Sequence, residues 1–362
     1  MTGMGVAVAA VVALVGLADG FASSFLKIYT ERGVALVVSR ADAASPLTST
    51  LDVKVGDAIA ALDSVEATCS GLVDLLVFED LGSDPLMVQG WPADTYMFGE
   101  LKVLEGQRLS QQYRGQKCFM VGHNLAESKN LKVGSTVSMS DEKYRIIGIY
   151  ESVSDLENNM AIMLLEDAQK LTGKPNQITG VSVKLKDTTP DNVALVQAEI
   201  EGPVAVKCDL KGKIKAKPPG EFVKSNNQIR LAKAMAWATS TVALIMGGIM
   251  VLNTMIMSVF ERTREIGILR AIGWRPGRVI RMILMESVLL SIGGGILGTL
   301  GGLGFILALS HVPTVNGVVQ ASITMNIVIE GFGIAILVGV LGAAYPAYRG
   351  AQLLPTEALR HE

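Results

Sequence analysis

Charged side chains that could pair with a partner are concentrated in one stretch, ERTREIGILRAIGWRPGRVIR at 261–281. It carries two glutamates and six arginines, and apolar runs flank it on both sides. If the stretch is helical, Glu261 lies three residues before Arg264, a spacing that favours an ion pair on a helix surface. The residue types indicate recognition by charge rather than catalysis.

Apolar residues are mixed into the same stretch. Ile266, Leu269 and Ile272 are expected on one side of a short helix, which Gly273 ends and Pro276 stops. A solvated loop would not need such a stripe, and a helix lying on a membrane would show a simpler basic and apolar split. We therefore expect a docking element for another protein.

Catalytic and metal-binding patterns are not evident in the sequence. The three histidines are scattered, and the three cysteines match no zinc spacing: Cys69, Cys118 and Cys208. Buried free thiols are expected, and a disulfide among them stays open. The carboxylates in FEDLGSDP and SDLEN are expected in solvated loops. A formal net charge of −2 gives no indication of nucleic acid as a partner.

The composition indicates a membrane protein. Of 362 residues only 18% are charged, below the roughly 25% usual in soluble domains, and the mean hydropathy is +0.40. Apolar runs long enough to cross a bilayer predict four transmembrane helices, at 4–26, 231–260, 279–309 and 323–347. A cleaved signal peptide is an alternative for the first, although MTGM lacks the basic residues of such a leader.

The arginine-rich segment also predicts an orientation. Basic short loops face the cytoplasm, so 261–278 is expected there, together with both termini and the tail 348–362. Residues 27–230 and the short loop 310–322 then lie outside. The chain is expected in the inner (cytoplasmic) membrane, crossing it several times, with a large domain inserted between helices one and two.

Several residues inside the predicted spans are notable. Three glycines follow one another at four-residue spacing, which lets two membrane helices pack closely: Gly294, Gly298 and Gly302. Packing within the chain and packing between subunits both stay open. Glu286 is expected to pair with Arg281 at the membrane interface, and Glu330 to reach the outer surface.

The inserted segment has the pattern of an α+β domain. Alternating apolar residues predict strands at 34–40, 118–122, 135–140 and 144–152. Helices are expected near 55–62 and 164–172. A basic segment with a Pro-Pro-Gly break, 207–230, is expected to link the domain to the second span, where it could contact anionic lipid headgroups.

Two motifs resemble a known family. NTMIMSVFERTREIGILRAIGWRPGRVIRMILMESVLLSIGGGILG and the tail PAYRGAQLLPTEALRHE are similar to the signature and closing motif of the MacB/FtsX-like ABC permeases. In the tail, Pro346, Arg349 and Pro355 occupy matching places. The domain resembles the extracytoplasmic core domain of that family in pattern, around CFMVGHNLAESKNLKVGSTVSMSDEKYRIIGIY.

The resemblance implies a site and partners. It implies a coupling helix that inserts into a separate ATPase subunit, with the contact carried onto Glu261, Arg264, Glu265, Ile266, Gly267, Arg270 and Gly273. The chain has no G-x-x-x-x-G-K-[ST] loop. ATP and magnesium would therefore be bound by the ATPase dimer, and no cofactor is expected in this chain. A second permease copy or paralogue is expected too.

Two functions stay open on this resemblance. One is a permease that moves its outside domain to export or extract a substrate from the outer face of the membrane. The other is an FtsX-like mechanotransmitter, which regulates an outside cell-wall enzyme or adaptor and transports nothing. Family members usually have a basic stretch before the first span, which MTGM does not supply.

Overall fold

The computed structural model describes residues 2–42, 49–81, 85–139, 142–310 and 325–352. It divides into two compact units, which we treat separately. The helical unit comprises 1–20, 232–309 and 321–362, and the domain unit comprises 21–231 and 310–320. The predicted outer loop 310–322 and the closing motif beyond Gln352 lie almost wholly outside the described residues.

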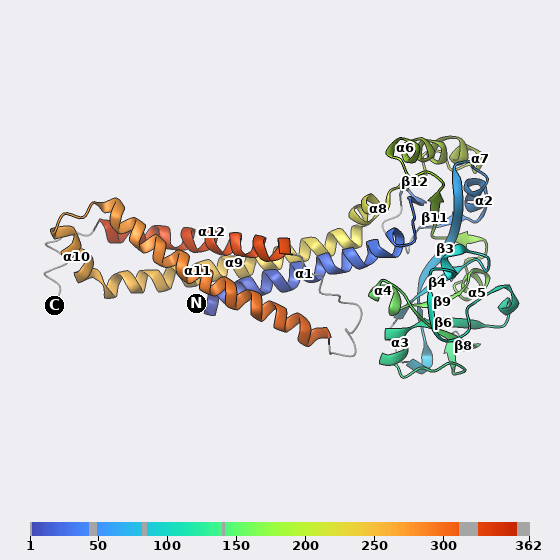
Figure 1. Cartoon of the computed structure of the whole chain (residues 1–362), viewed down its shortest axis with the longest axis horizontal. Helices are drawn as coiled ribbons and strands as arrows, with labels where there is room; N and C mark the ends of the chain where they lie inside the picture. Colours follow the sequence, from blue (N-terminus) through green and yellow to red (C-terminus); the bar gives the residue numbers. More distant parts are fainter. Residues whose placement is uncertain (1, 43–48, 82–84, 140–141, 311–324, 353–362) are drawn as a thin grey trace. The chain divides into compact units, whose positions relative to one another are not determined.

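The helical unit contains four long helices and one short one (Figure 1). The long helices are α1 (Thr2–Thr30), α9 (Asn227–Glu261), α11 (Pro276–Ser310) and α12 (Met325–Ala351), and the short one is α10 (Thr263–Ala271). All four long helices are long and apolar enough to cross a membrane. The four predicted spans fall on these helices, the last from Met325 on.

The domain unit is built on one large mixed sheet. Its strand order is β12-β1-β11-β3-β4-β9-β6-β8-β5, with β7 paired to β8, and a separate small sheet joins β2 to β10. Most pairs are antiparallel, but β4 with β9 and β6 with β8 are parallel. The strands are β1 (Leu36–Arg40), β2 (Leu51–Asp52), β3 (Val65–Val77), β4 (Pro85–Trp91), β5 (Lys102–Gly106), β6 (Cys118–Gly122), β7 (Thr136–Met139), β8 (Glu142–Glu151), β9 (Ala161–Leu164), β10 (Gln177–Ile178), β11 (Gly180–Leu185) and β12 (Ile214–Lys217).

Short helices connect and cover these strands. They are α2 (Lys54–Ala60), α3 (His123–Ser128), α4 (Asp155–Asn158), α5 (Leu165–Leu171), α6 (Pro190–Glu199), α7 (Ala205–Lys207) and α8 (Pro219–Ser225). Single turns occur at Glu79–Leu81, Tyr96–Phe98 and Gln111–Tyr113, and a π-helical turn at Ile200–Val204 contains Pro203. The predicted α+β class is confirmed, as are the predicted strands and helices.

Both faces of the sheet are buried. Because side chains alternate along a strand, Leu36 and Val38 enter one core while Val37 enters the other. Helices α2, α5 and α6 contribute to the first core. The second core is closed by residues 21–30, the end of α1, together with α8. The last turns of the first long helix are therefore part of the domain.

Candidate functional site

Helix α10 is a separate short helix between α9 and α11. The chain leaves helical geometry at Arg262 (φ −101°, ψ 16°), and α10 begins at Thr263. At its other end the Trp274 N–H donates to the Leu269 carbonyl at 3.1 Å while Gly273 adopts a φ of +101°, a conformation suited to glycine. Pro276 then starts α11, as the sequence predicts.

One face of α10 is fixed to its own helical unit. Ile266 is 2% exposed and packs with Met255 of α9, Val279 and Ile283 of α11, and Ala347 of α12. Gly267 beside it is buried as well. Three long helices thus pack around the Ile266 side chain of α10.

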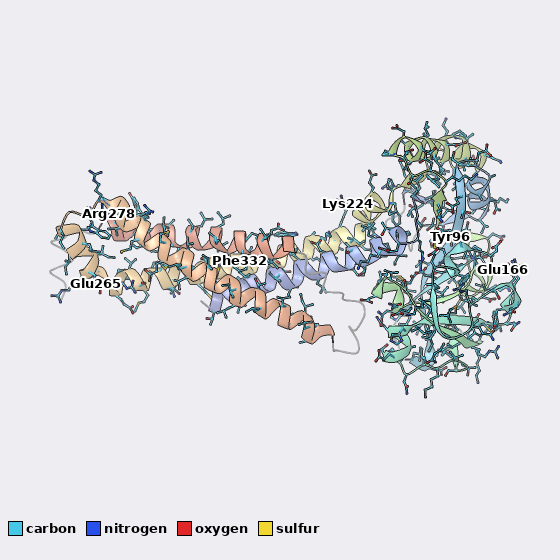
Figure 2. The ribbon with its side chains drawn as sticks, viewed as in Figure 1. Tyr96, Glu166, Lys224, Glu265, Arg278 and Phe332 are labelled. Carbon is cyan, nitrogen blue, oxygen red and sulfur yellow. The ribbon has the colours of Figure 1, made fainter. Side chains whose placement is uncertain are left out.

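The opposite face of α10 is exposed and mixed in chemistry. Arg264 and Glu265 are exposed, Ile268 is 42% exposed and Ile272 is 75% exposed. At about 100° per residue these four side chains fall on one side of the helix. Figure 2 labels Glu265 on this helix. Exposed isoleucines between charged groups are typical of a surface that another protein covers.

The sequence prediction of this face was partly wrong. Ile266 and Ile272 do not share a side, because six residues turn a helix by about 240°. Of the residues carried over by resemblance, Ile266 and Gly267 face inward in this structure, whereas Glu261, Arg264 and Glu265 face outward. The prediction missed Ile268, although its four-residue spacing from both Arg264 and Ile272 could have revealed it.

Arg270 and Gly273 shape the end of α10 rather than its outer face. The Arg270 Nη1 donates to the Trp274 carbonyl at 2.8 Å, and its Nε is buried without a hydrogen-bond partner in the described part of the chain. Trp274 in turn stacks under Arg278, whose guanidinium carbon is 5.2 Å from the ring centroid. Arg270 therefore ties the helix to the turn that follows it.

The junction of α9 and α10 also carries an ion pair. Arg262 Nη1 lies 3.3 Å from Glu286 Oε1 on α11. The sequence predicted a pair with Arg281 instead, but residues five apart on a helix face different sides. Glu286 thus joins the start of α10 to the neighbouring helix, and Glu330 on α12 is exposed.

The glycine stripe of α11 faces α1 of the same chain. A Cβ on Gly298 would lie 2.5 Å from the Gly5 carbonyl oxygen and 2.7 Å from the Val8 Cβ. A Cβ on Gly302 would lie 3.1 Å from the Ala9 carbonyl oxygen, and Gly294 packs on Met4. The two backbones therefore approach too closely for larger side chains. On the other side of α11, Phe332 of α12 (labelled in Figure 2) covers Gly295.

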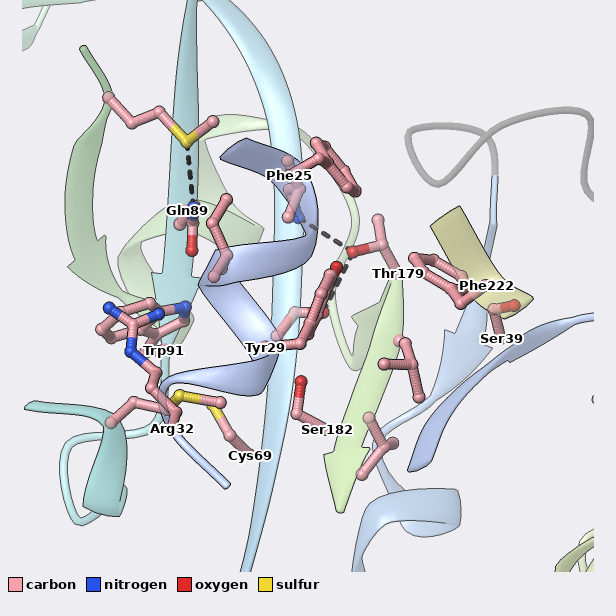
Figure 3. A pocket seen from close by; sticks show the side chains of 18 of the residues that line it. Phe25, Tyr29, Arg32, Ser39, Cys69, Gln89, Trp91, Thr179, Ser182 and Phe222 are labelled. Carbon is pink, nitrogen blue, oxygen red and sulfur yellow. Dashed lines mark hydrogen bonds between the residues drawn. The ribbon is translucent and has the colours of Figure 1, made fainter. Parts of the chain in front are cut away.

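A buried ion pair fixes the end of α1 to the domain. Arg32 donates through Nη1 and Nη2 to both carboxylate oxygens of Glu157, at 2.9 and 2.5 Å, and the two side chains are 6% and 0% exposed. The Arg32 guanidinium carbon lies 5.1 Å from the centroid of the Trp91 ring. Figure 3 labels both residues. A second contact with the end of α1 is a hydrogen bond, in which the Ser154 hydroxyl donates to the Ser24 carbonyl at 2.8 Å. We call this set the domain anchor.

Surrounding groups complete the domain anchor. Ser152 donates to the Glu157 carboxylate, and the Tyr150 hydroxyl donates to the Glu157 carbonyl at 2.8 Å. Burial opposes the charge of Arg32, but the Glu157 charge and hydrogen bond outweigh it and raise the pKa of Arg32. The prediction that SDLEN is a solvated loop is wrong for Glu157. Its partner is 125 positions away in sequence, so no local pattern indicates it.

A small cavity lies between the end of α1 and the sheet. Its volume is about 80 Å³, and Phe25, Tyr29, Trp91, Met160 and Phe222 are among the side chains around it (Figure 3). Ligand pockets usually measure about 300–1,000 Å³. The cavity is therefore a packing defect beside the domain anchor rather than a pocket for a drug-sized ligand.

The cysteines are free thiols in the domain. Cys69 and Cys118 are buried and Cys208 is half-buried, so the predicted burial holds for two of the three. Burial raises the pKa of the Cys69 thiol to about 12. Among the described residues no group of three or more His, Cys, Asp or Glu side chains could hold a metal ion.

Comparisons with known proteins agree on one family. A family model for the MacB-like periplasmic core domain matches residues 1–202, and one for the FtsX-like permease C-terminal region matches 237–355. The chain is 25% identical to the macrolide export ATP-binding/permease protein MacB of Bdellovibrio bacteriovorus, over 100% of this chain and 59% of the relative.

A second relative is an uncharacterized ABC transporter permease of Methanocaldococcus jannaschii. It is 29% identical over 67% of this chain and 61% of its own length. The chain thus spans about three fifths of the length of these curated relatives. Among solved structures, the periplasmic region of MacB from Actinobacillus actinomycetemcomitans matches with 12% identity and a TM-score of 0.43, over 54% of this chain and 94% of that one.

Proposed function

The chain belongs to the MacB/FtsX-like family of ABC transporter permeases, and from this premise we propose that it is the permease subunit of an ABC transporter complex. A separate ATPase dimer binds ATP and magnesium, and this chain converts the ATPase cycle into motion of its domain. The motion serves export or extraction of a substrate at the outer face of the membrane.

The observation that carries this proposal is the exposed face of α10. Helix α10 is held by Ile266 inside the chain, while Arg264, Glu265, Ile268 and Ile272 have no cover among the described residues. Because α9, α11 and α12 hold α10, a partner that pushes on its exposed face would transmit force to these three helices. The exposed Glu261 extends this face at the end of α9.

The route of the motion is proposed to include α1. This helix is continuous from Thr2 to Thr30, and its last turns belong to the domain core. The domain anchor joins the turn that follows it to α4 through the two-bond ion pair of Arg32 with Glu157, a strong and directional contact. If α1 is displaced, the domain would therefore move with it.

Placement in the cell membrane is part of the proposal. The four apolar helices support a multi-pass protein, and the arginine-rich α10 side is assigned to the cytoplasm with both termini. The packing of Gly294, Gly298 and Gly302 on α1 supports the intrachain role for this stripe. The second permease copy, or a paralogue, would then use other surfaces.

A mechanotransmitter is the second candidate function. The cavity at the domain anchor is far smaller than a ligand pocket, which favours a domain that passes on motion over one that encloses a substrate. In that case the outside partner is an enzyme or adaptor. Both functions share the ATPase and the α10 contact.

Purification of the tagged chain in mild detergent, with mass spectrometry of what accompanies it, tests the proposal. We expect an ATPase subunit in equal amount. A bound lipid or substrate would favour export, and an outside hydrolase or adaptor would favour mechanotransmission. Recovery of the chain without any ATPase, even after crosslinking at the α10 side, would contradict both.

A further inference from the structure

A groove opens on the helical unit where α9 and α12 end beside α10. Its volume is about 490 Å³, and the residues that line it are Ile256, Val259, Phe260, Thr263, Tyr345, Pro346, Arg349, Gly350 and Gln352. It includes Pro346 and Arg349 of the closing motif, to which the α10 contact gives no role. The groove is separate from the exposed face of α10.

Close packing at Gly350 forms the floor of the groove. A Cβ at this position would lie 3.1 Å from Val259 Cγ1 and 3.2 Å from Ile283 Cδ1. The helices therefore touch here, while above this point Phe260 and Tyr345 leave the walls open to the surroundings. The walls are apolar, because most lining side chains are aliphatic or aromatic.

One cation lies in this apolar groove. The Arg349 guanidinium stacks on Tyr345, at 5.8 Å from the ring centroid, and its Nε donates to the Tyr345 hydroxyl at 3.1 Å. Among the described residues Arg349 forms no ion pair, and no residue lining the groove is acidic. The nearby Arg262 differs, because Glu286 neutralises it. Among the residues that the structure describes, the cation in the groove thus has no anionic partner.

We propose that this groove binds one anionic phospholipid. The acyl chain lies against Ile256, Val259 and Phe260, and the phosphate pairs with the Arg349 guanidinium, whose planar donors match phosphate oxygens. Basic groups between membrane helices near the cytoplasmic surface commonly hold such headgroups. Other apolar residues of both helices are also exposed, such as Met257 and Leu341, and on the proposed membrane placement they would face lipid, which favours a lipid over a protein segment.

The inference adds a regulatory contact to the proposed function and rests on its membrane placement. Thr263, the first residue of α10, lines the groove. A lipid bound there would contact the start of the docking helix, so the surrounding bilayer would influence how firmly α10 is held.

The test uses the full chain in nanodiscs of phosphatidylcholine with one fifth phosphatidylglycerol, followed by native mass spectrometry of the lipids it retains. We expect one phosphatidylglycerol per chain. Arg349→Gln should lower this retention about fivefold. Arg349→Lys, which keeps the charge but loses the planar donors, should lower it less. Arg278→Gln is the matched control, because Arg278 also stacks on an aromatic ring but does not line the groove.

Several outcomes would overturn the inference. Equal retention of phosphatidylcholine, or unchanged retention in Arg349→Gln, would exclude a headgroup site. If phosphatidylglycerol binds only after removal of 353–362, the tail occupies the groove instead. If Arg349→Gln leaves the lipid but loses the ATPase, the groove belongs to that protein. Failure of the chain to enter nanodiscs would reject the membrane placement itself. Loss of the lipid from a chain that still enters nanodiscs would reject only the lipid site.

Discussion

Two groups of charged residues in this chain lie in opposite environments, one exposed and one buried. On α10, Arg264 and Glu265 are exposed next to exposed isoleucines. In the domain anchor, Arg32 and Glu157 are almost completely buried and bind each other with two hydrogen bonds. The comparison separates charges for which we propose an external partner from charges that already have one inside the chain.

The physical reason lies in desolvation. Removing an ion from water costs several kcal/mol, so a buried charge persists only where a partner compensates it. The domain anchor meets this condition inside the chain. Exposed charges on α10 lose little by remaining hydrated, and they can exchange water for another protein without refolding.

The largest expected effect comes from breaking the domain anchor. Arg32→Met leaves Glu157 as an uncompensated buried charge, and we expect a loss of about 3–5 kcal/mol in the free energy of unfolding. The domain should then melt about 10 °C lower, measured by tryptophan fluorescence of the full chain in detergent, with Trp237→Phe and Trp274→Phe in both compared chains so that only Trp91 reports.

Two controls sharpen this result. Lys102→Ala breaks an exposed pair with Glu151 and should cost less than about 1 kcal/mol. The double change Arg32→Met with Glu157→Leu removes both charges and should recover much of the loss. An equal effect for Lys102→Ala and Arg32→Met would contradict the contrast between the two kinds of charge.

The next effect concerns the exposed face of α10. Ile268→Asp with Ile272→Asp should leave the fold intact but lower the binding of the proposed ATPase at least about 30-fold, because buried apolar anchors dominate interfaces. The amount of ATPase that co-purifies measures it. Leu195→Asp, which changes an exposed leucine of α6, is the control. ATPase binding that persists in the double variant would reject this face as the contact.

Gly298→Leu should have a smaller effect, confined to the helical unit. Its side chain would meet the Gly5 carbonyl and Val8, an overpacking worth about 1–3 kcal/mol. Thermal loss of helical circular dichroism would measure the change. At Gly304 on the same helix an added Cβ would meet nothing within 4 Å, so Gly304→Leu should be nearly neutral. Equal melting of the two variants would mean that α11 does not pack on α1 through this stripe.

The smallest effect is a difference in thiol reactivity without any change in stability. A maleimide should label Cys208 in the folded chain and reach Cys69 and Cys118 only after unfolding. Since the thiolate reacts, a pKa of about 12 leaves Cys69 almost fully protonated at pH 8, and its thiolate fraction rises about tenfold per pH unit up to that value. Fewer than three thiols in the unfolded, unreduced chain would reveal a disulfide.

The sequence predicts what depends on neighbours along the chain. Helix periodicity and apolar length indicate the four long helices, and Gly273 with Pro276 marks the end of α10. Alternation likewise indicates strands such as β6 and β8. Both patterns can be recognised because their repeat is shorter than the helix or strand that contains it.

Contacts made through space were beyond those patterns. Arg32 pairs with Glu157, which lies 125 positions away in sequence. Glu286 pairs with Arg262, at the junction of α9 and α10, rather than with Arg281 on its own helix. The sides of α10 were misassigned for a different reason, because Ile266 and Ile272 were placed together although six residues turn a helix by about 240°. Which face is buried depends on where α9, α11 and α12 lie, and only the folded unit shows it.

The shared use of residues 21–30 has a consequence for how such proteins can be recombined. The aromatic rings of Phe21, Phe25 and Tyr29 lie on the long apolar helix α1 and pack in the domain core, and the ring centroids of Tyr29 and Phe222 are 5.7 Å apart. A domain exchanged between two permeases at position 27 would lose two of these three rings, Phe21 and Phe25. Exchange at positions 20 and 231 would transfer all of these rings together. The unit to exchange is therefore the domain together with the end of its first helix.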